Sequence, residues 1–169
     1  MRFTRFHRAA CLSLVGLALL LGSSSWAGPQ SGEMPLAKMV FGRHQVLAEV
    51  PISSDQRMKG LGGRQTLEPG RGMLFIFYGK PLSMCMRGMH FPLDFIWLNQ
   101  GKVSQISSNV PPGGVKVTVR AIGPAQMVLE VPAGWARDHG VHLGQEVNVT
   151  MLSKGLPKGL AVVLRSTQP

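Results

Sequence analysis

LDFIWLNQGKVSQIS, residues 93–107, contains two predicted strands and the turn that joins them. Residues 93–99 and 102–107 combine apolar, aromatic and β-branched side chains, which are enriched in strands. Asn99-Gln100-Gly101 lies between the two runs, and a short turn of this composition is typical of a β-hairpin. The stretch therefore predicts an antiparallel pair of strands.

Short apolar runs separated by glycine and proline recur on both sides of this hairpin. They predict further strands at residues 39–41, 46–50, 72–78, 82–86, 126–131, 145–151 and 160–164. Two short helices are also expected, one capped by Ser53 together with Gln56 and one over residues 134–139 that stops at Gly140. We predict a mainly β fold, a small closed or half-closed barrel of antiparallel or mixed strands with two short helices.

The chain has 169 residues, with 18 Lys and Arg against 8 Asp and Glu, a net charge of +10. Hydrophobic residues make up 44% and charged residues 15%, a composition that excludes a disordered chain and fits a single domain. The positive charge is spread along the sequence without a basic run, so we expect no nucleic acid partner. The summed field of these charges could attract an anionic component of the cell envelope.

The first 27 residues have the layout of a secretory signal peptide. Basic residues lead into an uncharged run at residues 9–22, and Ser25-Trp26-Ala27 follows with small residues at its first and third positions. The run is shorter than the ~20 residues that span a bilayer. We therefore expect export to the periplasm or the medium, cleavage after Ala27 and no membrane anchor in the mature chain. Residues 28–37 are expected to form a flexible leader.

The β domain is expected over residues 38–152, followed by a C-terminal extension at residues 153–169. Three motifs lie in order within this domain: residues 48–64 with Arg57, Gly60, Leu61 and Arg64, residues 70–77 (GRGMLFIF), and residues 84–94 (MCMRGMHFPLD). Together with residues 128–131 and 140–144 they resemble the signature of the DUF192 family, and several ordered motifs are far more specific than one. The resemblance implies a compact, mainly β fold and frequent export. It implies no established activity.

The chain departs from the family pattern at its most polar positions. Cys85 stands where the family has Trp, Gly88 where it has Asn, and Met89 where it has Thr. Gln56 and Gly62 replace its Glu and Met. If the signature lines a ligand pocket, this chain has lost hydrogen-bonding groups from that pocket.

Asp94 begins a strand face that is otherwise apolar, because Ile96 and Leu98 follow it on the same face. A carboxylate in such a place must be paired with a charge or bound to backbone N–H groups. Arg64 and Arg87 are the expected partners, because a guanidinium group binds a carboxylate through two parallel hydrogen bonds.

This cluster of charges has a functional and a structural interpretation. In the functional one, it forms a concave site for a small polar or anionic ligand or an envelope component. Arg64 and Arg87 supply charge and donors, Asp94 orients them, and Met86 and Phe75 form an apolar wall. In the structural one, the charges form an ion pair that joins parts of the barrel.

A sulfur-rich segment supports a second hypothesis, a copper(I) site. Met84, Met86, Met89 and His90 carry the soft or borderline ligands that copper(I) accepts. Met84 and Met86 share one strand face, so only a bend at Gly88 could bring the other two toward them. The structural alternative is that these methionines fill an irregular part of the core.

Cys85 would be the only thiol left after signal cleavage. Such a thiol is buried and inert, reactive, or joined to another chain. A thiolate nucleophile with His90 as its base would need Asp94 to orient the imidazole, and no surrounding motif supports that arrangement.

We favour a binding protein over an enzyme and expect no cofactor. The rival hypothesis is a hydrolase or lyase that acts on an envelope polymer with Asp94 as general base. Glycoside cleavage usually needs two carboxyl groups, and Glu130 could be the second only if the fold brings it close to Asp94. A third class, a structural or assembly module, would show no pocket and a large exposed apolar patch.

Overall fold

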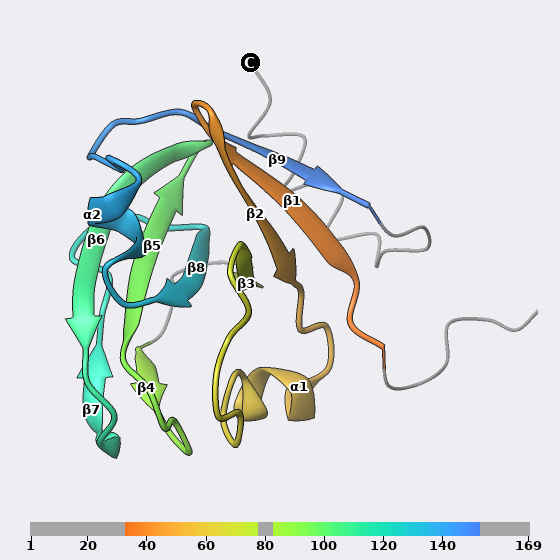
Figure 1. The fold of residues 1–169 in the computed structure, drawn as a ribbon, viewed down its shortest axis with the longest axis vertical. Helices are drawn as coiled ribbons and strands as arrows, with labels where there is room; N and C mark the ends of the chain where they lie inside the picture. Colours follow the sequence, from red (N-terminus) through yellow and green to blue (C-terminus); the bar gives the residue numbers. More distant parts are fainter. Residues whose placement is uncertain (1–32, 78–82, 153–169) are drawn as a thin grey trace, which may run out of the picture. The chain divides into compact units, whose positions relative to one another are not determined.

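The computed structural model describes residues 33–77 and 83–152. Its strands are β1 (Leu36–Phe41), β2 (His44–Glu49), β3 (Arg71–Ile76), β4 (Met84–Met86), β5 (Leu93–Asn99), β6 (Lys102–Val110), β7 (Gly114–Val119), β8 (Met127–Pro132) and β9 (Val147–Met151), and its helices are α1 (Ser54–Lys59) and α2 (Trp135–Asp138). Seven strands form one sheet in the order β6-β5-β8-β3-β2-β1-β9, and β4 and β7 form a separate ribbon (Figure 1). The predicted signal peptide and the predicted strand at residues 160–164 lie outside the described residues.

The large sheet curls into a half-closed barrel. Its neighbouring strands are antiparallel, except that β2 and β3 run parallel. At one end, Lys102 of β6 pairs with Glu146, just before β9. There the backbone N–H of Val103 also donates a hydrogen bond of 2.9 Å to the carbonyl of Gln145. The edge strands meet only at this end, so the predicted mainly β, half-closed and mixed barrel with two short helices is confirmed.

The locally encoded elements form where the sequence predicts them. The hairpin of β5 and β6 turns at Gln100 and Gly101, both with positive φ. Helix α1 has the expected capping box, in which the Gln56 N–H donates to Ser53 Oγ and the Ser53 N–H donates to Gln56 Oε1, each over 3.1 Å. Gly140 follows α2 with a φ of +64°, as a left-handed stop requires.

Two elements differ from the prediction. Strand β1 begins at Leu36, within the range expected for the flexible leader, because it pairs with both β2 and β9. Strand β7 was not predicted. It alternates exposed and half-buried side chains and pairs only with the short β4, so its sequence lacks the apolar run that marks the other strands.

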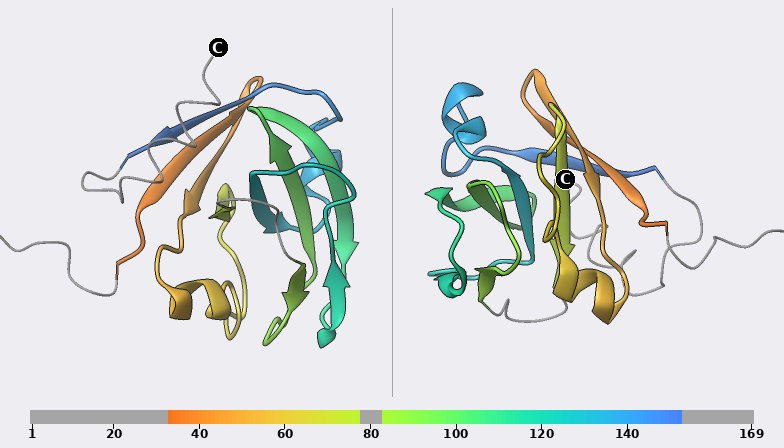
Figure 2. Two further views of the ribbon diagram at one scale, coloured as in Figure 1. Left: turned by 180° about the vertical axis from the view of Figure 1, so that it is seen from behind. Right: turned by 60° about the horizontal axis from the view of Figure 1, so that its bottom comes forward.

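The sheet has an apolar layer on each face. The inner layer lies in the curl of the barrel, includes residues of all seven strands, and is covered by Trp135 and Ala136 of α2. The outer layer covers β3, β5 and β8 and packs against the β4–β7 ribbon and against Leu61, which follows α1. Figures 1 and 2 show α1 and the ribbon at the same end of the described part, away from α2. Residues of β3, β5 and β8 are therefore buried on both faces.

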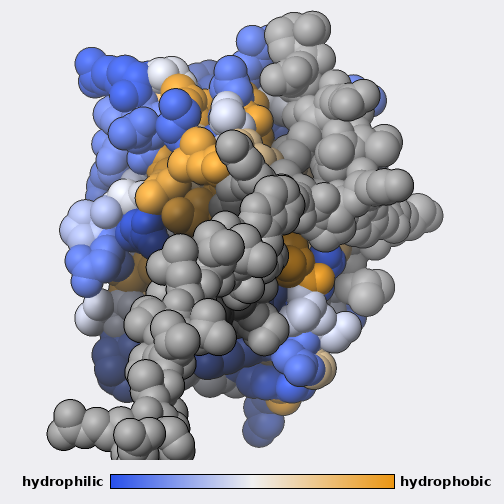
Figure 3. Space-filling model, turned by 90° about the vertical axis from the view of Figure 1, so that its right-hand side faces the viewer, coloured by the Kyte–Doolittle hydropathy of each residue, from blue (hydrophilic) through white to orange (hydrophobic). Residues whose placement is uncertain are grey.

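Few large apolar side chains are exposed in the described residues. Figure 3 views the side on which β1 and β9 lie, where apolar residues show mainly in the upper part of the face and polar residues border them. Within the described ranges, no helix is both long enough and apolar enough to cross a bilayer.

Asp94 lies on the inner face of β5 and is fully buried. Its Oδ1 accepts a hydrogen bond of 2.8 Å from the Asn109 N–H, and its Oδ2 accepts one of 3.0 Å from the Ala136 N–H. Asn109 belongs to a bulge in β6, where its φ is +54°, and Ala136 lies in the first turn of α2. The predicted pairing of Asp94 with an arginine is therefore wrong, because two backbone N–H groups satisfy the carboxylate.

We predict that Asp94→Ala destabilises the protein strongly, because it leaves two buried N–H groups without acceptors. The free energy of unfolding should fall by roughly 2–4 kcal/mol, measured by urea denaturation. Asp94→Asn should lose less, because its amide oxygen still accepts one bond. Asp138→Asn, at an exposed carboxylate, is the control. An Asp94→Ala protein that unfolds at the wild-type urea concentration would contradict this role.

Candidate functional site

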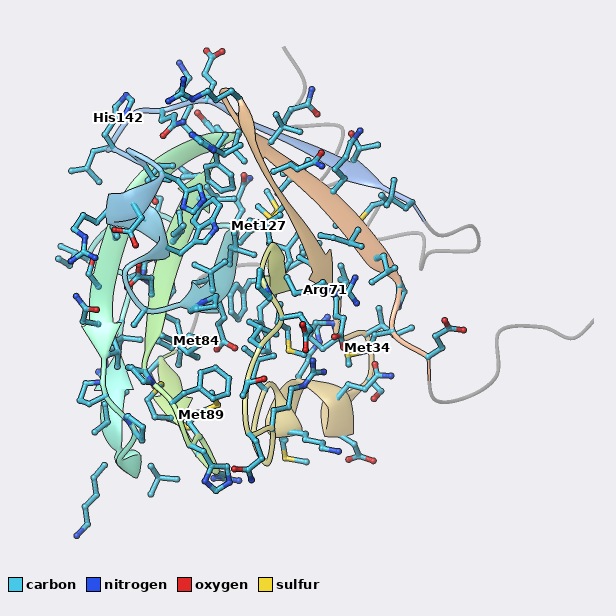
Figure 4. All side chains as sticks on the ribbon, viewed as in Figure 1. Met34, Arg71, Met84, Met89, Met127 and His142 are labelled. Atoms are coloured by element: carbon cyan, nitrogen blue, oxygen red, sulfur yellow. The ribbon has the colours of Figure 1, made fainter. Side chains whose placement is uncertain are left out.

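A pocket of about 370 Å³ opens on the outer face of the sheet, between α1, β3, β8 and β4. Its walls are mostly apolar and rich in sulfur. Met84 and Met89 reach it from β4 and from the turn after β4 (Figure 4). The lining residues include Leu61, Phe75, Phe77, Met84, Met89 and Glu130.

Glu130 is the one acidic residue among the described residues that line the pocket. It lies in β8 between Met73 of β3 and Phe95 of β5, and its side chain points to the same outer face as theirs. Only 4% of the residue is exposed. No described residue forms a hydrogen bond with its carboxyl group, whose oxygens reach the pocket and are not sealed in the core. Burial raises the pKa of Glu130 to about 8, so the carboxyl group is mostly protonated and uncharged at neutral pH.

Positive charges lie among the residues that line the pocket. Arg57 and Lys59 come from α1, and Arg87 comes from the turn after β4. Arg57 is held in place, because its Nη1 donates a hydrogen bond of 3.1 Å to the carbonyl of Ile76. With Glu130 protonated, the lining therefore carries a net positive charge, which favours an anionic ligand.

The loop after α1 packs directly on the turn after β4. A Cβ on Gly62 would lie 2.8 Å from the carbonyl oxygens of Arg87 and Lys59, so this position has no room for a side chain. The Gly63 N–H donates a hydrogen bond of 2.8 Å to the carbonyl of Gly88. These contacts hold two sides of the pocket together.

Departures from the DUF192 pattern gather at this pocket. Gly62, Cys85 and Met89 line it, and Gly88 lies against Gly62. Part of the family signature therefore lines a pocket. In this chain a glycine, a thiol and a thioether replace larger or more polar groups, so the walls offer few hydrogen bonds.

The predicted site residues separate into two groups. Phe75 and Arg87 line the pocket. Met86 is 1% exposed and lies in the outer apolar core, whereas Asp94 lies on the opposite face of the sheet. Arg64 does not line the pocket, and no carboxylate of the described residues lies within ion-pair distance of Arg87.

Arg64 pairs with Glu49 of β2. Its Nη1 and Nη2 donate to Glu49 Oε1 and Oε2 over 2.8 and 2.7 Å, the two-pronged geometry expected for an arginine but with another acid. The hydrogen bonds from Arg64 lower the pKa of Glu49. In the sheet, Glu49 of β2 lies opposite Met73 of β3, and Met73 lies opposite Glu130 of β8. The Arg64–Glu49 ion pair is therefore on the same face as Glu130, two strands away from it.

The two buried carboxyl groups do not face each other. Phe95 pairs with Glu130 and Asp94 pairs with Val131, so alternation places Asp94 inside the barrel and Glu130 outside it. The fold thus does not bring Glu130 close to Asp94 on one surface. A double-carboxyl site of the kind that glycoside cleavage needs is not formed by this pair.

The four predicted copper(I) ligands also separate. Met84 and Met89 line the pocket, Met86 is buried in the core, and His90 is exposed and does not line the pocket. Cys85 is exposed and lies at the pocket, so it is not a core residue. In the described ranges, no three His, Cys, Asp or Glu side chains gather as metal ligands would.

A second cavity of about 410 Å³ lies near α2. Its rings pack on one another, with His139 stacked on Trp135 at a centroid distance of 4.3 Å and His44 edge-on to His139 at 4.8 Å. Its acid, Asp138, is exposed and bound to Arg137. None of the described titratable residues that line this cavity is buried, so we place the candidate site at Glu130.

From the sequence, Glu130 was expected only as a possible second carboxyl group beside Asp94 and not as the centre of a site. A signal was present, because Glu130 interrupts the apolar run Met127–Pro132 in the same way that Asp94 interrupts its own strand. The pocket itself could not be read from the sequence, since its walls come from four separate segments.

We predict that Glu130→Gln stabilises the protein increasingly as the pH rises from about 5 to about 8. Folded and unfolded chains both bind the Glu130 proton below its ordinary value of 4.5, and only the folded chain keeps it up to about 8. Wild-type stability therefore falls across this window, by up to about 1.4 kcal/mol per pH unit. The Gln side chain does not ionise in this pH range, so its contribution to stability does not change with pH.

Urea denaturation at several pH values measures this difference. Glu68→Gln, at an exposed carboxylate, controls for the loss of one acidic group. A constant difference between Glu130→Gln and the wild type from pH 5 to 8 would show that the folded protein does not retain the proton.

The comparisons with known proteins agree with the fold. No curated protein matches the chain. A solved structure of a candidate transcription regulator from Sinorhizobium meliloti 1021 is 28% identical and covers 71% of this chain and 96% of its own, with a TM-score of 0.61. A protein of unknown function from Novosphingobium aromaticivorans DSM 12444 is 30% identical and covers 71% of this chain and 89% of its own, also with a TM-score of 0.61. The model of DUF192, a family described as uncharacterized, matches residues 37–149, and the chain therefore belongs to the DUF192 family.

Proposed function

We propose that this protein binds a small organic anion with an apolar body in the Glu130 pocket. One observation carries the proposal: a carboxyl group with which no described residue forms a hydrogen bond lines an apolar pocket, and the other charged residues of the described lining are all cations. A titratable group in apolar surroundings that reaches a pocket is a candidate contact for a ligand.

The size and chemistry of the pocket support a small ligand. A volume of about 370 Å³ corresponds to roughly twelve non-hydrogen atoms at the ~30 Å³ that a water molecule occupies. Phe75, Phe77 and Leu61 would cover an apolar body. Arg57, Lys59 and Arg87 would bind an anionic group through charge-assisted hydrogen bonds.

The proposal includes export and a role in the cell envelope. The layout of residues 1–27 supports export. The net positive charge would favour retention near anionic envelope components, one of which could carry the bound group.

A binding role fits the site better than catalysis. Both oxygens of Asp94 are occupied by backbone N–H groups inside the barrel, where a general base could not reach a substrate. In the part of the pocket that the structure describes, Glu130 is the only carboxyl group, and no histidine lies beside Cys85.

A structural or assembly role has one observation in its favour. Ile106, Ile122 and Leu143 line a shallow hollow beside the edge strand β6, and Ile122 is 93% exposed. Nothing in the described residues shows what would cover this hollow, whereas the Glu130 pocket has both shape and charge.

We predict that Arg87→Ala weakens the binding of carboxylates such as octanoate about 5- to 20-fold, because it removes a charge-assisted hydrogen bond. Isothermal titration of the purified protein measures the affinity, after a thermal-shift screen with alkyl and aryl carboxylates, phosphates and sulfonates. Arg43→Ala, in the turn between β1 and β2, is the matched control.

The outcome is decisive in either direction. Stabilisation by anions that Arg87→Ala reduces and Arg43→Ala leaves unchanged would support the pocket. A screen in which no organic anion raises the melting temperature, or equal binding by both variants, would refute the proposal.

A further inference from the structure

The proposed anionic group accounts for the cations of the pocket, and no described residue forms a hydrogen bond with the Glu130 carboxyl group, which reaches the pocket. Gln or Leu at this position would avoid the ionisation of a buried acid, and the chain nevertheless has Glu there. The carboxyl group is therefore a candidate contact for a second group of the same ligand.

The surroundings of Glu130 explain its protonation. Met73 of β3 and Phe95 of β5 flank it in the sheet, and both are buried and apolar. The charged and titratable groups that face it from the packed elements are Arg57 and Lys59 of α1, Cys85 of β4, Arg87, and, farther across the same face, Arg71 and the Glu49–Arg64 ion pair. None of them forms a hydrogen bond with Glu130.

The polar groups of the pocket lie beside two different positions along β3. Arg57 binds the carbonyl of Ile76, whereas Glu130 pairs with Met73. Three residues along a strand span about 10 Å. A ligand that contacts both Arg57 and Glu130 therefore has two polar ends with several apolar atoms between them.

We infer that the ligand carries a hydrogen-bond acceptor, such as a keto oxygen, at the end opposite its anionic group, and that the Glu130 carboxyl group donates to this acceptor. This inference rests on the proposed function and names the class of its ligand. An oxo acid of moderate length fits, because its acceptor needs a donor and its body needs apolar walls. An amine fits less well, because it would have to displace the Glu130 proton and enter past three cations.

The inference has a consequence for pH. Because burial keeps the proton on Glu130 up to about pH 8, the affinity for such a ligand should be constant below that value. Above it, the affinity should fall by up to about tenfold per pH unit, because the ionised carboxylate has no proton to donate and repels the acceptor.

Three probes of equal length test the inference: octanoate, 7-oxooctanoate and 7-aminoheptanoate. Isothermal titration with the wild-type protein at pH 7 should show 7-oxooctanoate binding about fivefold more tightly than octanoate, the gain expected for one buried hydrogen bond. Glu130→Leu should remove this difference and still bind octanoate. Glu130→Gln, which keeps a donor, should preserve the preference and bind equally well at pH 7 and 9, whereas wild-type binding should weaken.

The possible failures are distinguishable. Equal affinities for octanoate and 7-oxooctanoate would overturn the inference and leave the anion pocket standing. Tightest binding of 7-aminoheptanoate with release of a proton would also overturn it, because Glu130 would then act as an anion. Binding of none of the three probes would contradict the proposed function itself.

Discussion

The carboxylate of Asp94 joins three parts of the chain at one buried point. It belongs to the second residue of β5, accepts a hydrogen bond from the bulge of β6, and accepts another from the first turn of α2. The helix is thereby held where Trp135 and Ala136 cover the inner apolar layer. The same anchor fixes which side chains of β5 face inward, and so leaves Phe95 on the outer face beside Glu130.

A second carboxyl group on the neighbouring strand has the opposite environment. Asp94 receives two N–H donors, whereas Glu130 receives none and borders a pocket. Hydrogen bonds from N–H groups favour a charged carboxylate, and apolar burial favours a protonated one. Asp94 lies opposite Val131, the residue after Glu130, so the two acids point to opposite faces of the sheet. They therefore have different roles: Asp94 holds the fold, and Glu130 is available to a ligand. This difference in environment is the basis for the proposed function.

The sequence predicted the features that depend on neighbouring residues. The hairpin of residues 93–107 and the capping box of Ser53 form because their hydrogen bonds are local. The partner of Arg64 could not be predicted, since Glu49 lies 15 residues away at the end of β2 and no local pattern encodes their contact. Glu130 and Asp94 show the same sequence pattern, a single acid in an apolar strand. Whether such an acid holds the fold or lines a pocket depends on the face of the sheet to which it points, and the sequence does not show that face.

The protonation of Glu130 is the central claim, and a direct titration tests it. Carbon-13 NMR of protein labelled at the glutamate side-chain carboxyl carbons, with Glu130→Gln to assign the signal, follows this group from pH 4 to 10. The account predicts a midpoint of about 8. A midpoint near the ordinary value of 4.5 would show that the carboxyl group is charged at neutral pH, and the account would then be wrong.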